Sequence, residues 1–284
     1  MLLSEMSLGE IMENIKDSLV LFDVDGTLTE PRQRISKKMI ESLRQLSFNT
    51  EIGLLTGSGL DYIKEQLWPL LADKEVSLNC HVLPCNGTAY YIPNPESPGN
   101  FIEIFKTSME GKLGFEVFNG VMTALMILQG RLAEEDYDIS FTGHHFQNRG
   151  SMINWSPIGR NANNGDRQQF IAMDRMYGIR KRFLREFREE MLSRGIEDVT
   201  VKFGGDTSFD IYPTGWDKTF ALKHFPETNW DVMFIGDRCG PNGNDREIFE
   251  HLKDSERSFE TSGPEETIEI IDIYINKIIG ELDG

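Results

Sequence analysis

One stretch of the 284-residue chain decides its fold: Ser18-Leu19-Val20-Leu21-Phe22-Asp23-Val24-Asp25-Gly26-Thr27-Leu28-Thr29. Its first part, 18–24, is a short apolar run that predicts a buried strand, and the Asp-Gly pair at its end predicts a tight turn. Outward from this stretch, helical and strand patterns alternate, with helices expected at 35–46 and 61–71 and buried strands at 51–55 and 81–83. Strands that alternate with helices pair in parallel, so this part of the chain predicts an α/β layer sandwich.

A different pattern occupies the middle of the chain. Three prolines and a glycine fall within residues 92–100, which we interpret as a stiff linker. Beyond it we expect longer helices at 113–134 and 179–193 and short alternating strands at 139–142, 151–155, 199–203 and 208–212. This mixture predicts an α+β domain with an antiparallel sheet.

The α/β pattern returns at Asp217. A helix is expected at 218–224, a strand at 231–235, and a C-terminal helix from Pro264, because proline is favoured in the first helical turn. We therefore expect residues 1–91 and 214–284 to form one α/β core and residues 92–213 to form a second domain inserted into it.

Composition limits the classes of function. The chain is 39% hydrophobic and 26% charged, as in ordinary globular proteins, and its formal net charge is −17. Nucleic acid is not an expected partner, because binding to a phosphate backbone needs a basic face. The chain has no run of about eighteen apolar residues, and Met1–Lys16 lacks the basic and apolar parts of a secretory signal. We therefore expect neither a membrane span nor secretion.

The cysteines favour a reduced, cytoplasmic protein. Cys80, Cys85 and Cys239 are an odd number without the spacing of a disulfide framework. Cys80, His81 and Cys85 could be zinc ligands, but no second pair follows at ligand spacing. We expect them to flank or fill a buried strand.

Acidic and hydroxyl residues follow the predicted strands where each strand ends. Asp23 and Asp25 end the first strand, Thr56 and Ser58 end the second, and Asp237 follows the strand at 231–235. Ligands bind at the carboxyl ends of the strands of an open α/β sheet, so we expect these side chains to meet at one edge. Thr56 and Ser58 offer donors to phosphate oxygens, although either could simply cap the next helix.

The acidic residues suit phosphoryl transfer. Asp23 and Asp25 are two residues apart, so along an ideal strand both side chains point the same way, and two close carboxylates repel unless a cation intervenes. With Asp237 as a third oxygen donor, Mg²⁺ is the natural fit. With the metal and Lys218 neutralising charge, Asp23 can attack phosphorus. Asp25 can give or take the proton of a sugar hydroxyl.

A basic segment runs from Arg149 to Arg194, where ten Arg and Lys residues stand against five Asp and Glu residues. An anion site is one interpretation. A solvated helix face explains most of 175–194.

These motifs resemble those of a known family. Asp-x-Asp-Gly-Thr-Leu at 23–28, the strand-end Thr56 and Ser58, Lys218 and Gly236-Asp237 resemble the four signature motifs of the haloacid dehalogenase (HAD) superfamily. A cap inserted after the third strand is similar to the subgroup that acts on sugar phosphates. Three longer stretches resemble the eukaryotic-type phosphomannomutases: Asn148–Arg160 with its Ser-Pro-Ile-Gly-Arg, Gly204–Lys218, and Asn242–Phe249.

The resemblance implies a HAD-like Rossmannoid parallel-sheet core with an α+β cap. It implies that Asp23 is the nucleophile and Asp25 the acid/base, with Lys218, Thr56 and Ser58 completing the catalytic set. The implied Mg²⁺ ligands are Asp23, the backbone of Asp25 and Asp237, supported by Asn244 or Asp245. The family's substrate positions fall on Arg32, Arg149, Arg160, Arg167, Ser208 and Asp210, of which the arginines hold the distal phosphate and the last two touch the sugar.

The implied activity is interconversion of mannose 6-phosphate and mannose 1-phosphate through an Asp23 phosphoenzyme. A hexose 1,6-bisphosphate is the implied activator, GDP-mannose synthesis the pathway served, and a homodimer formed through the caps the assembly. A Mg²⁺-dependent sugar-phosphate phosphatase with the same nucleophile is the alternative, and a non-catalytic binding protein is a third. Four departures from the family leave open the balance of mutase and phosphatase activity and the choice between mannose and glucose. They are Thr56-Gly57-Ser58 in place of Gly-Gly-Ser, Arg238 where Lys is common, Asn242-Gly243 in place of a Gly pair, and a longer cap at 93–142.

Overall fold

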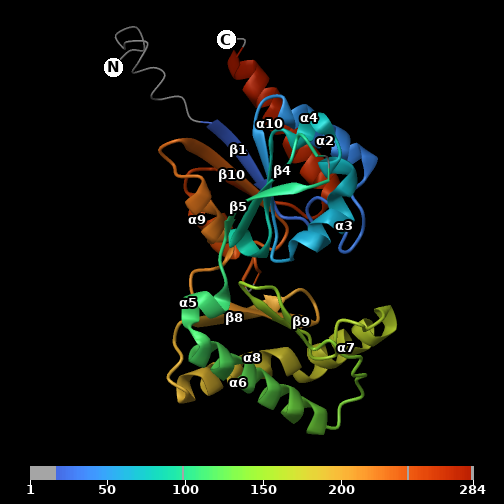
Figure 1. Cartoon of the computed structure of the whole chain (residues 1–284). Helices are drawn as coiled ribbons and strands as arrows, with labels where there is room; N and C mark the ends of the chain where they lie inside the picture. The colour runs from blue at the N-terminus through green and yellow to red at the C-terminus, as the bar shows by residue number, and fades with distance from the viewer. Residues whose placement is uncertain (1–16, 98, 242, 283–284) are drawn as a thin grey trace. The chain divides into compact units, whose positions relative to one another are not determined.

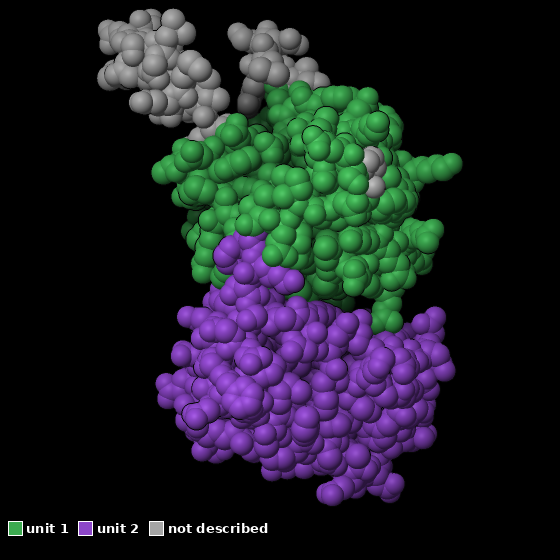
Figure 2. Space-filling model, viewed as in Figure 1, with its two compact units in different colours: residues 1–104, 218–239, 247–284 green, residues 105–217, 240–246 purple. Residues whose placement is uncertain are grey.

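A computed structural model describes residues 17–97, 99–241 and 243–282 (Figure 1). The segment Met1–Lys16, for which no secretory signal was expected, lies outside the described residues. The chain divides into two compact units, coloured separately in Figure 2. Unit 1 contains the described residues up to Ile104 together with 218–239 and 247 onward, and unit 2 contains 105–217 and 240–246.

Unit 1 is built on a seven-stranded sheet with the order β11-β10-β1-β2-β3-β4-β5. The strands from β11 to β3 pair in parallel, as predicted, and β4 pairs antiparallel with β3. The bounds are β1 Asp17–Phe22, β2 Glu51–Leu55, β3 Cys80–Leu83, β4 Ala89–Pro93, β5 Phe101–Lys106, β10 Trp230–Gly236 and β11 Ser258–Glu260.

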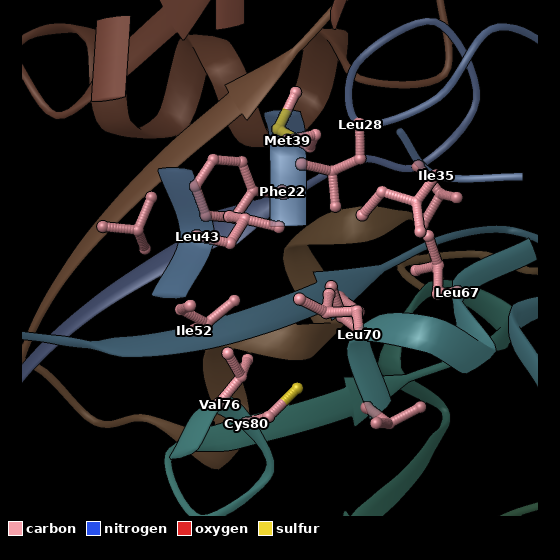
Figure 3. Packing of buried hydrophobic residues seen from close by; sticks show 14 of the residues in the cluster. Phe22, Leu28, Ile35, Met39, Leu43, Ile52, Leu67, Leu70, Val76 and Cys80 are labelled. Atoms are coloured by element: carbon pink, nitrogen blue, oxygen red, sulfur yellow. The ribbon is translucent and has the colours of Figure 1, made fainter. Parts of the chain in front are cut away.

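Helices cover both faces of this sheet. They are α2 Lys37–Ser47, α3 Leu60–Leu71, α4 Lys74–Ser77, α9 Arg246–Lys253 and α10 Pro264–Leu282, with the 3₁₀ turns η2 Cys85–Gly87 and η3 Lys218–His224. Figure 1 shows α2, α3 and α10 on one side of the sheet and α9 on the other. Successive side chains of a strand point to opposite faces. Val20 and Phe22 therefore join one buried cluster with α2, part of which is shown in Figure 3. Leu19 and Leu21 join another with η3 and α9. Two buried faces explain why β1 is apolar without alternation.

Unit 2 has a four-stranded antiparallel sheet with the order β6-β7-β9-β8. Its strands are β6 Phe146–Asn148, β7 Ile153–Trp155, β8 Val199–Gly204 and β9 Ser208–Pro213, and its helices are α5 Met109–Leu113, α6 Phe115–Glu134, α7 Asn164–Tyr177 and α8 Ile179–Ser193. The core of this unit lies between the sheet and α6 and α8. Trp155 is fully buried there, stacked on Phe209 with ring centroids 4.7 Å apart.

Several local predictions were wrong. Residues 139–142 form no strand, because both the N–H and the hydroxyl of Thr142 donate to the carbonyl of Ile158 and hold the segment as a loop. The proline-rich segment is the connection between β4 and β5, so the sheet of unit 1 continues beyond it. The helix expected at 218–224 is a 3₁₀ helix. By contrast, the helix expected at 113–134 is confirmed as α6, which begins at Phe115 after its N-cap Gly114, with φ +82°.

The three cysteines are buried and form no disulfide with one another. Burial raises the pKa of the Cys80 thiol to about 12, so this side chain behaves as an apolar group in β3. His81 beside it is hydrogen-bonded to Glu51 and to the hydroxyl of Tyr90. Among the helices in the described ranges, none is long and apolar enough to cross a membrane.

Candidate active site

The chain turns sharply where β1 ends. The N–H of Asp23 still donates to the carbonyl of Ile235 in β10 at 3.0 Å, and the N–H of Gly26 then closes the turn on the carbonyl of Thr29 at 2.7 Å. Gly26 has φ +88°, and a Cβ at this position would lie 2.3 Å from Oδ2 of Asp237. Both the backbone conformation and this close approach require glycine.

Asp23 and Lys218 form a buried ion pair in unit 1. The Lys218 side chain is fully buried, Asp23 is 4% exposed, and Nζ of Lys218 donates to Oδ1 of Asp23. Removing two charges from water is costly unless they are paired and hydrogen-bonded. The pair therefore offsets the charge of a carboxylate in a site largely closed to water, and it fixes the position of that carboxylate.

A group of acidic oxygens lies at the same place. Among the described residues, Asp23, Asp237 and Asp245 each offer one carboxylate oxygen, and these oxygens lie within 4.8 Å of one another. Asp245 is fully buried, and Asn244 next to it is partly exposed. A set of oxygen donors without sulfur or imidazole suits a hard cation such as Mg²⁺.

The carboxylate of Asp25 has separate partners. Its Oδ1 accepts hydrogen bonds from the backbone N–H of Arg32 at 2.9 Å, from Nε2 of Gln66 at 3.0 Å and from the hydroxyl of Tyr62 at 3.3 Å. Because β1 ends at Phe22, strand alternation does not govern the direction of Asp25, and its carboxylate is not part of the acidic group. Three donors instead hold it in one orientation.

Thr56 and Ser58 form the loop after β2. Oγ1 of Thr56 accepts from the N–H of Ser58 at 3.1 Å, and the N–H of Thr56 donates to the carbonyl of Leu83 at 3.2 Å. Thr56 is buried and Ser58 is partly exposed. The N-cap of α3 is Gly59, without a side-chain capping bond, so neither hydroxyl caps that helix. The capping alternative is therefore wrong.

Unit 2 carries a polar cluster on one face of its sheet. Ile153 and Trp155 point into the core, so Asn154 between them points to the opposite face. Ser208 and Asp210 share that face, because Asn154 pairs directly with Asp210 across β7 and β9.

Four of the predicted substrate residues are joined through Asn154, which is 2% exposed. Its Oδ1 accepts from Nη1 of Arg160 at 2.9 Å, and its Nδ2 donates to Oδ1 of Asp210 at 2.7 Å and to Oγ of Ser208 at 3.1 Å. Nη1 of Arg149 lies 3.7 Å from the same oxygen of Asp210. Unit 2 thus brings two arginines, a hydroxyl and a carboxylate together around one amide.

The remaining arginines lie elsewhere. Nη1 of Arg167 in α7 donates to Oγ1 of the buried Thr207 at 2.9 Å, which ties α7 to the residue before β9. Arg32 belongs to unit 1, where its backbone contacts Asp25 and its side chain is exposed. Most other arginines of 149–194 pair with acidic residues along the helices, as a solvated face would: Arg180 with Asp174, Arg182 with Glu135, Arg185 with Glu189 and Arg194 with Glu190.

Sequence reasoning missed four residues of these sites. Asn154 lies within the stretch Asn148–Arg160 that carried the family resemblance, so its position in the motif was a usable signal. Thr207 likewise lies within the stretch Gly204–Lys218. Tyr62 and Gln66 gave no such signal, because their roles arise from contacts between distant segments.

Known structures of the same fold act on phosphate esters. The IMP-bound mutant IMP-nucleotidase of Plasmodium falciparum is similar with a TM-score of 0.65 and 13% identity, over 92% of this chain and 67% of that one. Trehalose-6-phosphate phosphatase of Aspergillus fumigatus is similar with a TM-score of 0.51 and 15% identity, over 92% and 93%. At these identities the likeness shows the HAD-like fold alone.

Proteins related in sequence have a higher identity to this chain than these solved structures do. Phosphomannomutase 2 of Dictyostelium discoideum is 33% identical over 267 residues, which cover 94% of this chain and 100% of the relative. The phosphomannomutase of Saccharomyces cerevisiae is 34% identical over 274 residues, which cover 95% and 100%. The sequence model of eukaryotic phosphomannomutases matches residues 37–277. The chain therefore belongs to the eukaryotic phosphomannomutase family.

Proposed function

We propose that the protein interconverts mannose 6-phosphate and mannose 1-phosphate through a phosphate ester on Asp23. The observation that carries the proposal is the buried pair of Asp23 and Lys218 at the carboxyl end of β1, in a chain of this family. A lysine that neutralises the carboxylate lets it approach a phosphate dianion and compensates the charge of the ester that forms.

The transfer uses three groups of unit 1. An oxygen of Asp23 forms a bond to phosphorus while the bond from phosphorus to the sugar oxygen breaks, and Asp25 protonates the departing oxygen. In the return step the sugar hydroxyl gives its proton back to Asp25 and takes the phosphoryl group from Asp23. The hydrogen bonds from Arg32, Tyr62 and Gln66 orient Asp25 for both steps. We assign Thr56 and Ser58 to the phosphate oxygens.

The acidic oxygens fit a magnesium ion. Asp23, Asp237 and Asp245 would hold it, supported by Asn244 and the backbone of Asp25. Bound there, Mg²⁺ would screen the carboxylates from one another and polarise the phosphate.

Removal of the ion with EDTA is expected to stop activity without unfolding the protein, because the buried clusters of unit 1 are apolar.

Gly26→Ala should weaken this metal site. The new Cβ would force the Asp237 carboxylate away, so we expect the affinity for Mg²⁺ to fall by about 10-fold or more. Calorimetric titration with Mg²⁺ measures the affinity independently of activity. Gly59→Ala is the matched control, because a Cβ there meets nothing within 4 Å. Equal affinities in the two variants would argue against Asp237 as a ligand.

Asp23→Asn should abolish both isomerisation and hydrolysis of a small aryl phosphate, because an amide is no nucleophile. It also leaves Lys218 buried without its countercharge, which costs about 3–5 kcal/mol of stability. Adding Lys218→Met removes the second charge and should restore the melting temperature but not the activity. Asp61→Asn, an exposed change of the same kind, is the control. Substantial turnover by a folded Asp23→Asn protein would refute the nucleophile assignment.

A mutase also needs a site for the phosphate that is not being transferred. We assign this site to Arg149, Arg160 and Arg167 of unit 2, and contacts with the sugar to Ser208 and Asp210. Guanidinium groups fit phosphate oxygens bidentately. The proposed intermediate is a hexose 1,6-bisphosphate, which also serves as activator and reorients so that either phosphate can occupy this site. Arg32 in unit 1 is assigned to substrate binding as well. The product would feed GDP-mannose synthesis in the cytoplasm.

Arg160→Gln separates a mutase from a phosphatase. A charge-assisted contact to phosphate contributes about 1.5–3 kcal/mol, so kcat/KM for mannose 1-phosphate should fall by roughly one to two decades. Hydrolysis of a small aryl phosphate, which has no distal phosphate, should persist. The control is Arg175→Gln, at an exposed arginine of α7. If both activities fall together, or neither falls, the sugar-phosphate phosphatase suggested by Thr56-Gly57-Ser58 becomes the better assignment.

We further propose a homodimer formed through unit 2. Val121, Leu125 and Leu128 of α6 are buried in the core of unit 2, so they are not available for an interface. Phe115, Met126 and Ile127 remain exposed on the same helix, by 68%, 58% and 37%. We place the interface on this helix, because these apolar side chains are exposed to water there and an interface would bury them.

Met126→Glu should therefore shift the mass in solution from dimer to monomer, because a charge buried in an apolar interface is unfavourable. Light scattering at micromolar concentration measures this mass. Met176→Glu places the same charge at a 69% exposed methionine of α7 and should leave the dimer unchanged. A wild-type protein that is monomeric in this measurement would refute the proposed homodimer.

A further inference from the structure

One face of η3 (Lys218–His224) links two parts of the catalytic site. A 3₁₀ helix has three residues per turn, so Lys218, Ala221 and His224 lie in a row along the same face. Lys218 at one end pairs with Asp23. The other two residues contact η2 (Cys85–Gly87).

The contact between η3 and η2 is close and specific. A Cβ on Gly87, which has φ +81°, would lie 2.7 Å from Cα of Ala221, so the two backbones touch. Nε2 of His224 lies 2.7 Å from the carbonyl oxygen of Gly87. A carbonyl can only accept, so Nε2 carries the proton, and burial lowers the pKa of His224 and favours the neutral ring.

The segment that His224 holds is strained. Cys85 and Asn86 have φ +52° and +62°, a left-handed conformation that side chains with a Cβ rarely adopt, and Gly87 continues it. Such a conformation persists only where its surroundings impose it. The carbonyl of Gly87 is the point at which η3 supplies that constraint.

The strained segment in turn holds the loop after β2. The N–H of Asn86 donates to the carbonyl of Thr56, and the N–H of Cys85 donates to the carbonyl of Ser58, each at 2.9 Å. The chain of contacts therefore runs from His224 through η2 to the two residues assigned to the phosphate oxygens.

We infer that His224 is a positioning residue for phosphate binding: through the carbonyl of Gly87 it fixes the Thr56-Gly57-Ser58 loop relative to the Lys218–Asp23 pair. The inference rests on the proposed function of those residues. His224 acts through the carbonyl of Gly87, so its effect falls on the binding of the phosphate.

The test compares His224→Phe with His224→Gln. Phenylalanine keeps a ring among the neighbouring aromatics, where Tyr90 lies 5.1 Å from the imidazole, but it has no N–H. Glutamine can place an amide N–H near the position of Nε2. With a small aryl phosphate as substrate and inorganic phosphate as competitive inhibitor, His224→Phe should raise both KM and the inhibition constant by about 10-fold. His224→Gln should stay close to the wild type in both.

A purely structural role predicts a different result. Loss of folded protein lowers kcat in proportion to the folded fraction and leaves KM and the inhibition constant unchanged. Unchanged constants in His224→Phe, or the same rise in both variants, would overturn the inference. If His224→Phe does not fold, His224→Met replaces it, since methionine matches glutamine in length and lacks the donor. Aryl phosphate hydrolysis that survives Asp23→Asn refutes the proposed function itself, whereas an inactive Asp23→Asn beside an unaffected His224→Phe refutes only the role of His224.

Discussion

The ion pair of Lys218 and Asp23 is the constraint on which the rest of the site depends. The two residues are 195 positions apart, and their side chains are closed off from water. A charge buried this deeply is tolerated only with its partner in place, so the fold that forms must bring the end of β1 and the start of η3 together. Residues 105–217 lie between them in sequence and belong, together with 240–246, to unit 2.

The same pair explains why the neighbouring positions accept few other residues. Asp23 is fixed by Lys218 and by the parallel pairing of β1 with β10, so Asp237 at the end of β10 has to share a small space with it. Gly26 leaves that space open, since any Cβ would meet the Asp237 carboxylate. Three acidic oxygens so close together repel one another. A bound cation relieves that repulsion. The acidic group is therefore better explained as a metal site than as a contribution to the stability of the fold.

The sequence alone was sufficient where the signal is local. Continuous apolar runs located β1 and β2, and helical periodicity located α8, because burial on both faces of a sheet or on one face of a helix leaves a direct pattern in the residues. Prediction from the sequence failed where contacts between distant segments determine the local structure. The loop at 139–142 has an alternating pattern but is held by Ile158, and α7 buries only Phe170 and so has little periodicity. The partners of Asp25 were invisible for the same reason, as Tyr62 and Gln66 come from a helix whose docking the pattern does not specify.

The amide of Asn154 lies at the centre of the polar cluster in unit 2 for a physical reason. Asn154 has to accept a hydrogen bond from Arg160 on one side and donate to Asp210 on the other, and a neutral amide does both. An aspartate there would face Asp210 with like charge, and a lysine would face Arg160. The amide also keeps both arginines beside a carboxylate: Arg149 lies 3.7 Å from Oδ1 of Asp210, and Arg160 donates to Asn154 next to it. Side chains already held by hydrogen bonds lose little freedom when a ligand binds. Guanidinium groups held in this way suit the doubly charged phosphate of the proposed substrate better than a flexible set of exposed arginines does.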